Sequence, residues 1–129
     1  MNDESMTIQE LKNKMAQFVR ERDWEKYHSP KNLSMAIAIE AAELMEKFQW
    51  LDVGDSRKEI ICNKKEIEEE LADIFACLLS FAYFYGIDLS DSFEHKMESN
   101  AQKYPIKKVK DKGIKAVNLC RKAYVKHKN

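Results

Sequence analysis

The sequence predicts an all-α protein, built as a four-helix up-and-down bundle with a further basic helix at its C-terminus. Only three glycines and two prolines occur in 129 residues, which leaves few places for the tight turns that join many short strands. Apolar side chains recur three and four residues apart in four long stretches joined by short links, the pattern of amphipathic helices in a bundle. Hydrophobic residues make up 44% of the chain and charged residues 34%, a balance typical of a globular domain.

The first helix is predicted to run from Thr7 to about Arg22. Thr7 and Glu10 have the spacing of a capping box, in which each side chain bonds to the backbone of the other residue. Apolar residues then follow at helical spacing, namely Ile8, Leu11, Met15, Phe18 and Val19. A short connection over residues 23–31 leads to the next helix.

The second and third helices are predicted over about Asn32–Leu51 and Asn63–Tyr85. Gly54 lies just past the second helix, where a glycine that stops a helix is favoured, and a polar link follows. Asn63 and Glu66 have the spacing of another helix start, and Gly86 ends the third helix. The apolar stripes are Ile37, Ala41, Leu44, Phe48 and Leu51 on the second helix, and Ile67, Leu71, Ile74, Leu78 and Phe81 on the third.

The fourth helix is predicted over about Leu89–Lys103, with Asp88 as its cap and a stop at Tyr104-Pro105. Beyond Pro105, four residues at helical spacing predict a fifth, basic amphipathic helix: Ile114, Val117, Cys120 and Tyr124. The sequence therefore divides into one domain over residues 1–105 and a basic tail over residues 106–129.

The charge is unevenly distributed although the net charge is zero. The tail carries nine Lys or Arg side chains against the single acid Asp111, a net charge of +8, so the first 105 residues sum to −8. An acidic body argues against a nucleic-acid-binding core. The tail is suited to contact nucleic acid, a membrane surface or the acidic body of another subunit, although a solvated tail is the simpler interpretation.

Location and redox state follow from what the sequence lacks. No apolar run has the length of a membrane span, and the N-terminal segment has no apolar signal-peptide core, so a cytoplasmic location is expected. Cys62, Cys77 and Cys120 are odd in number and widely spaced. This pattern indicates neither a disulfide framework nor a zinc site.

Two short acidic motifs are the candidate functional residues. Glu40 and Glu43 lie three residues apart on the second predicted helix, as Glu70 and Asp73 do on the third, so each pair shares one helical face. Aligned with an offset of 30 residues, the two helices give both pairs the same phase relative to their apolar stripes. Packing the stripes together is therefore expected to gather all four carboxylates in one partly enclosed region.

Four carboxylates near a core repel one another and raise each other's pKa values, a conflict that a divalent cation removes. All-oxygen ligation suits Mg²⁺ or Mn²⁺, and Mg²⁺ typically shares its ligands between carboxylates, waters and substrate phosphates. A bound cation neutralises phosphate charge, and a water on it serves as nucleophile.

Other interpretations of these acids stay open at this stage. In a chain with 22 acidic residues, either motif alone is more often part of a solvated face, and Glu43 with Lys47 has the spacing of a surface ion pair. A di-iron carboxylate bundle is disfavoured, because it requires Glu-x-x-His pairs on two helices, and of the three histidines (His28, His95 and His127) neither His95 nor His127 lies in such a pair.

The order of these motifs resembles that of the all-α nucleoside triphosphate pyrophosphatases, in the MazG-like and dCTP pyrophosphatase branch. The signature there is E-x-x-E, a helix-link-helix spacer and E-x-x-D, and here 26 residues separate Glu43 from Glu70. The resemblance covers about residues 7–105. Segments that share it are Arg22–Leu33, Glu43–Trp50 and Lys96–Pro105.

The resemblance implies hydrolysis of a nucleoside triphosphate at the α-phosphorus to a monophosphate and pyrophosphate, with Mg²⁺ as cofactor. It implies that Glu40, Glu43, Glu70 and Asp73 are the metal ligands and catalytic residues, and that the protein is a homodimer or homotetramer. It also implies that substrate is bound by two groups of residues: Trp24, His28 and Trp50 around the base, and Lys96, Asn100 and Tyr104 near the phosphates and sugar.

These assignments make physical sense from the residues themselves. Tryptophan rings are suited to stacking on a base, and on the predicted second helix Trp50 falls beside Glu43 and off the apolar stripe. Lys96, Asn100 and Lys103 share one helical face, which without the resemblance is ordinary solvated surface. Glu46 also matches a family acid, although an exposed glutamate is an equal interpretation.

Two departures from the family pattern leave the substrate open. Cys77, one turn after Asp73, stands where relatives often have tyrosine, and the 24-residue basic tail has no clear counterpart. The leading hypothesis is a pyrophosphohydrolase for dCTP or modified dCTP. The alternatives are the same chemistry on dUTP or damaged NTPs, and a non-catalytic helical adaptor that oligomerises and binds nucleic acid through its tail.

Overall fold

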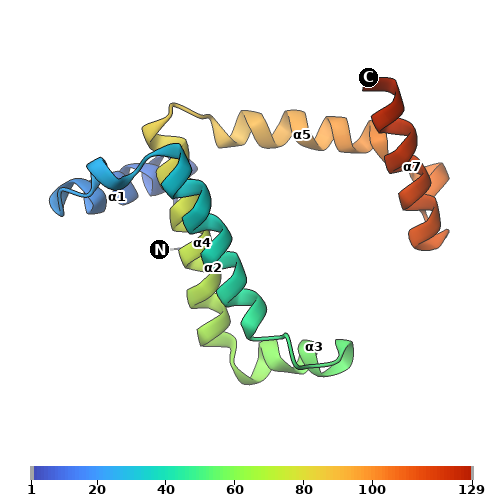
Figure 1. Ribbon diagram of the computed structural model, residues 1–129, viewed down its shortest axis with the longest axis horizontal. Coiled ribbons are helices and arrows are strands. Elements are labelled where there is room, and N and C mark those ends of the chain that lie inside the picture. The colour runs from blue at the N-terminus through green and yellow to red at the C-terminus, as the bar shows by residue number, and fades with distance from the viewer. Residues whose placement is uncertain (1, 129) are drawn as a thin grey trace. The chain divides into compact units, whose positions relative to one another are not determined.

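The computed structural model describes residues 2–128, which are helical throughout their regular structure and include no strand (Figure 1). The all-α prediction is confirmed. The elements are α1 Ile8–Glu21, a 3₁₀ turn Glu25–Tyr27, α2 Pro30–Glu46, α3 Val53–Cys62, α4 Lys64–Phe84, α5 Leu89–Lys103, α6 Ile106–Val109 and α7 Gly113–Lys128. They form two compact units, residues 1–87 and 88–129; Met1 and Asn129, the ends of the predicted domain and tail, lie outside the described residues.

The first helix begins with the capping box that the sequence predicts. The Thr7 hydroxyl accepts a hydrogen bond from the Glu10 backbone N–H at 3.2 Å, and the Glu10 carboxylate accepts one from the Thr7 N–H at 2.7 Å. The helix ends at Glu21, and Asp23 next to it has a φ of 54°, in the left-handed region. One face of α1 is buried through Ala16 and Val19.

Helices α2 and α4 lie side by side in opposite directions and carry most of the packing of the first unit (Figure 1). The start of α2 is fixed by Ser29, whose hydroxyl accepts from the Asn32 N–H at 3.1 Å, and by Pro30 at the first helical position. At the end of α4, Gly86 has a φ of 64°, a conformation that favours glycine. The buried core combines these helices with α1: Ala16, Val19, Leu33, Ile67, Leu79 and Ala82.

The segment between α2 and α4 differs from the prediction. The expected continuation of the second helix to Leu51 is wrong, because α2 ends at Glu46 and residues 47–50 form turns with hydrogen bonds between residues three apart. The expected polar link is instead the ten-residue helix α3, and Gly54 lies in its first turn rather than stopping the helix before it. The cause is local, since the Asp52 carboxylate accepts from the Asp55 N–H at 2.7 Å and so caps a new helix start.

The second unit contains α5, the one-turn α6 and α7. The predicted Asp88 cap is confirmed by a 3.0 Å hydrogen bond from the Asp91 N–H, and the predicted C-terminal helix is confirmed as α7. This helix packs on α6 and α5, with Val117, Cys120 and Tyr124 half-buried, and the Ser99 and Tyr124 hydroxyls lie 2.7 Å apart. Within the described part of the chain, no single helix is long and apolar enough to cross a membrane.

Candidate metal centre

The α2–α4 pair brings three of the four predicted acids together. Glu40 and Glu43 from α2 and Glu70 from α4 each offer a carboxylate oxygen, and these three oxygens lie within 4.8 Å of one another. Glu40 and Glu70 are half-buried, whereas Glu43 is exposed. Mg²⁺ and Mn²⁺ prefer oxygen ligands. Three carboxylate oxygens that converge from two helices therefore offer suitable ligands for either ion.

Asp73 lies at the edge of this group rather than inside it. Its carboxylate is not one of the three that lie within 4.8 Å of one another, and its residue is exposed. It is nevertheless close enough to raise the pKa of Glu40 through like-charge repulsion. The four residues, hereafter the acid quartet, therefore share one electrostatic environment.

The electrostatics of the quartet are unfavourable without a cation. Partial burial raises the pKa of the Glu40 carboxyl above its ordinary value, and repulsion from Glu43, Asp73 and Glu70 raises it further. Both effects disfavour the charged carboxylate. A divalent cation held between these oxygens would reverse the balance, so the donor set and its repulsion both fit a metal.

Lys47 joins the quartet from the turn after α2, which the sequence interpretation did not anticipate. Its Nζ lies 3.2 Å from a carboxylate oxygen of Glu70 and 3.4 Å from one of Glu66. The hydrogen bond to Glu70 is the main cause that raises the pKa of Lys47. Sequence spacing suggested a pair of Lys47 with Glu43, whereas the structure pairs Lys47 across to α4.

Cys77 lies next to the quartet on α4. Its thiol is free and half-buried. Burial raises the pKa of the Cys77 thiol, and the charges of Glu40 and Asp73 raise it further. The residue therefore stays a neutral thiol, one turn along the helix from Asp73.

Trp24 and His28 lie together before the start of α2. The Trp24 ring is 45% exposed and meets Phe18 edge-on at 6.0 Å. The His28 Nδ1 lies 2.7 Å from the Trp24 carbonyl oxygen, and the imidazole lies 5.7 Å from the Phe84 ring. At the rise of an α-helix, Glu40 lies about 15 Å along the helix axis from Pro30, the first residue of α2. Trp24 and His28 therefore lie in a different part of the unit from the quartet.

Trp50 lies in the turns that follow α2 and is 88% exposed. Its expected position on a helical face beside Glu43 is wrong, because the helix ends at Glu46. An indole with this exposure makes few contacts within its own unit and presents a flat apolar surface.

The predicted phosphate-binding residues belong to the second unit. Lys96, Asn100 and Lys103 lie on α5, and Tyr104 is its C-cap, with its N–H donating to the Asn100 carbonyl at 2.8 Å. The Lys103 ammonium lies 5.2 Å from the ring centres of Tyr104 and Tyr124. At the end of α5, Lys103 thus lies close to two aromatic rings, while Lys96 is further back along the helix.

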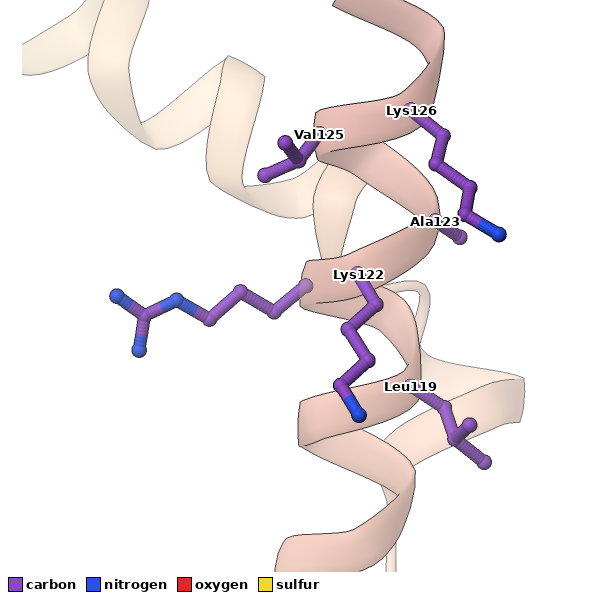
Figure 2. A pocket seen from close by; sticks show the side chains of 6 residues that line it. Leu119, Lys122, Ala123, Val125 and Lys126 are labelled. Atoms are coloured by element: carbon purple, nitrogen blue, oxygen red, sulfur yellow. The ribbon is translucent and has the colours of Figure 1, made fainter.

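A hollow on α7 is lined by side chains of that helix alone. Figure 2 shows its labelled side chains leaving a single helix in several directions, so the hollow is the surface between side chains of one helix rather than an enclosed cavity. Its lining residues are Leu119, Arg121, Lys122, Ala123, Val125 and Lys126.

Comparison with known proteins decides the family. The MazG-like family model matches residues 35–119, which include the whole acid quartet. The chain belongs to the MazG-like family. It is 32% identical over 117 residues to dCTP pyrophosphatase 1 of the rat, covering 89% of this chain and 69% of the relative. With dCTP pyrophosphatase 1 of Homo sapiens the identity is 34% over 101 residues, or 77% of this chain and 59% of the relative.

A solved structure gives the same result for the fold. The crystal structure of a pyrophosphatase from Archaeoglobus fulgidus matches with a TM-score of 0.74 and 37% sequence identity, and the match covers 81% of this chain and 98% of that one. The similarity extends over nearly the whole archaeal chain, so the bundle architecture expected from the sequence fits. Trp24 and His28 precede the part of the chain that the family model matches.

Proposed function

We propose that this protein hydrolyses a deoxynucleoside triphosphate, dCTP or a modified dCTP, to the monophosphate and pyrophosphate, with Mg²⁺ held by the acid quartet. The observation that carries the proposal is the convergence of Glu40, Glu43 and Glu70 within 4.8 Å in a MazG-like chain. Mn²⁺ is expected to substitute for Mg²⁺, because both accept the same oxygen ligands.

The enzyme class follows from the family and the named relatives. Membership of the MazG-like family and relatives named dCTP pyrophosphatase make the chain a nucleoside triphosphate pyrophosphatase. The non-catalytic adaptor is therefore disfavoured. Beyond this class, we propose the metal, the substrate and the roles of individual residues.

The residues of the quartet fit a divalent cation. Glu40, Glu43 and Glu70 would supply carboxylate oxygens, and Asp73 lies at their edge, close enough to raise the pKa of Glu40. A cation at this place supplies charge neutralisation for the phosphates and lowers the pKa of bound water. The neighbouring carboxylates explain the charge requirement, since their mutual repulsion disfavours the ionised metal-free site.

The protein's own carboxylates also provide a place for the proton that the reaction releases. In the proposed step, the oxygen of a water molecule bonds to the α-phosphorus, the bridging P–O bond to the β-phosphate breaks, and pyrophosphate leaves. A quartet carboxylate takes the proton from the water. Asp73 is suited to this role because its residue is exposed and its carboxylate lies outside the three converging oxygens.

Substrate recognition is assigned to two groups of residues. Trp24, His28 and Trp50 offer aromatic surfaces to the base, and two of these rings are accessible at 45% and 88% exposure. Lys96, Asn100 and Tyr104 offer a cation and polar groups to the phosphates and sugar. The names of the two mammalian relatives support dCTP, and Cys77 beside the quartet keeps dUTP and damaged nucleotides as alternative substrates.

We also propose that the protein works in the cytoplasm as a homodimer or homotetramer. Three large apolar side chains recur at helical spacing on α4 and stay accessible: Leu71, Phe75 and Leu78, with 51%, 37% and 38% exposure. A second copy of the chain would cover this row and remove its apolar surface from water.

The test is a comparison of acid substitutions. Glu43→Gln and Asp73→Asn are expected to lower kcat/KM with Mg²⁺ and dCTP by about 100-fold or more, because each removes a charge from the metal site. Glu68→Gln, an exposed acid of α4 outside the quartet, is the matched control and is expected to keep full activity. Phosphate products are resolved by ion-exchange chromatography across a panel of dNTPs.

The outcomes separate the parts of the proposal. Activity that survives both quartet substitutions contradicts the metal site. Release of orthophosphate instead of pyrophosphate contradicts attack at the α-phosphorus, and a preference for another nucleotide over dCTP corrects the substrate alone.

A further inference from the structure

Lys47 has an unusual place among the basic residues of this chain. It is the C-cap of α2, one turn beyond Glu43, and its side chain reaches across to α4. There its ammonium bridges Glu66 and Glu70, which are one turn apart, at 3.4 Å and 3.2 Å. The local hydrogen bonds that end α2 thus direct a cation towards the acid quartet.

The ion pair with Glu70 stands alone at the site. Among the side chains that the structure describes, Lys47 makes the only ion pair with any member of the quartet. Glu40, Glu43 and Asp73 have no basic partner within this part of the chain. In the described part of the chain, Lys47 is therefore the basic partner of the quartet, through Glu70.

This ion pair is also more buried than the others. Only 29% of the Lys47 side chain and 15% of the Glu70 side chain are exposed, whereas both members of the pair Lys64–Glu68 exceed half exposure. Solvent and salt screen a partly buried pair less than a surface pair. The attraction between Lys47 and Glu70 is therefore screened less than that within the exposed ion pairs.

We propose that Lys47 is a built-in counter-cation of the acid quartet, which stabilises the metal-free protein and weakens the affinity of the site for divalent cations. The inference rests on the proposed function, because it assumes that the quartet binds a metal. A divalent cation that binds Glu70 either displaces the ammonium or lies beside it. Both cost free energy, through the broken ion pair or through repulsion between like charges.

A simpler role for Lys47 makes a different prediction. A cation at the C-terminal end of a helix stabilises that helix through its dipole, and the loss of this effect would lower stability without tightening metal binding. A measurement of metal affinity therefore distinguishes the two roles. In the proposed role Lys47 acts on the metal site through Glu70 and does not contact the reacting atoms.

The experiment measures Mn²⁺ binding by calorimetry on the full chain, with no nucleotide present. Lys47→Met keeps the aliphatic stem and removes the charge, and it is expected to tighten Mn²⁺ binding by about tenfold and to lower the metal-free Tm. Lys47→Arg keeps the positive charge and is expected to bind Mn²⁺ as tightly as the unchanged protein does. Lys64→Met, which removes a charge paired with Glu68, is the matched control and is expected to change the affinity by about twofold or less.

A second pair of variants tests the same idea without altering Lys47. Glu66→Gln leaves the ammonium to Glu70 alone and is expected to weaken Mn²⁺ binding by about threefold more than Glu69→Gln, an exposed acid one turn from Lys65. In a Lys47→Met background this excess is expected to vanish. Should Lys47→Met fail to fold, Lys47→Gln and the single variants at Glu66 and Glu69 decide the question.

The results distinguish this inference from the proposed function. If the unchanged protein binds Mn²⁺ and Glu40→Gln abolishes binding, the metal site stands. Under that condition, binding by Lys47→Met that is no tighter than that of Lys64→Met overturns the role of Lys47 alone. If the unchanged protein binds no Mn²⁺, both proposals fall.

Discussion

At the scale of single residues, Glu40 is an acid whose surroundings disfavour its charged form. It is half-buried against α4 and faces three other acids, and both effects raise its pKa. Glu40 is thus a carboxylate offered to a metal whose charged form the metal-free protein disfavours. A binding site that is costly when empty is expected wherever charges are gathered for a ligand.

Glu40→Gln is therefore expected to raise the metal-free Tm at neutral pH while it abolishes metal binding. The sign follows from linkage, because a raised pKa in the folded state gives a contribution to stability that is present in acid and lost as the pH rises through that raised pKa. The gain from Glu40→Gln should thus be largest at neutral pH and shrink as the pH falls towards the ordinary pKa of glutamate.

Thermal unfolding in the presence of a chelator, measured over a series of pH values, checks this expectation. Glu94→Gln, at an exposed position of α5, is the control and is expected to show no such pH dependence. A Glu40→Gln protein that is less stable than the unchanged protein at neutral pH would contradict the electrostatic account of the quartet.

At the scale of elements, helix starts are fixed by short polar sequences. Thr7, Ser29, Asp52 and Asp88 each accept a hydrogen bond from a backbone N–H three residues ahead, which satisfies a donor that the helix leaves free. The same rule that predicted α1 and α5 explains why α3 begins where a link was expected. Termination is less local, since α2 ends five residues before its predicted end without a glycine or proline.

The capping box of α1 is expected to give stability a dependence on pH. The hydrogen bond from the Thr7 backbone and then that from the Thr7 hydroxyl lower the pKa of Glu10. A lowered pKa contributes stability that is present above the ordinary glutamate pKa and is lost as the pH falls through the lowered value.

Glu10→Ala is the variant that removes this contribution. Its Tm is expected to lie below that of the unchanged protein at neutral pH, with a difference that narrows in acid. Glu4→Ala, an exposed acid outside the helix, serves as control. A constant difference across the pH range would mean that Glu10 acts through helix propensity alone.

At the scale of the whole molecule, the C-terminal segment combines a packing surface with a large positive charge. Helix α7 packs on α6 and α5 with Val117, Cys120 and Tyr124 half-buried, while Lys115, Lys122 and Lys126 are exposed. The tail is therefore partly packed as well as partly solvated. The end of α5 meets α7 where the Lys103 ammonium lies 5.2 Å from the ring centre of Tyr124.

Deletion of residues 113–129 is expected to speed amide hydrogen exchange throughout α5 and to raise KM for the nucleotide severalfold, because α5 loses its packing partner. Protection in α2 and α4, which pack on each other, is expected to persist. The control replaces Lys115, Lys122 and Lys126 with Gln, which removes charge and keeps the packed face. Unchanged exchange in α5 after the deletion would show that α7 does not order it.

The sequence by itself determined the features of this protein that depend on neighbours along the chain. The capping box at Thr7, the stop at Gly86 and the cap at Asp88 involve residues within one turn, and the acid motifs were recognisable because i, i+3 spacing places two side chains on one helical face. The family signature was legible for the same reason, since it consists of such motifs in order.

Only the tertiary structure decided which groups meet across helices. The convergence of Glu40, Glu43 and Glu70, the position of Asp73 at their edge, and the pairing of Lys47 with Glu70 instead of Glu43 all depend on how α2 and α4 pack in opposite directions. The sequence thus shows the acid quartet only as two pairs of acids, each on one helical face. Its electrostatics, which set how strongly it needs a cation, exist only once packing brings the pairs together and removes them partly from water.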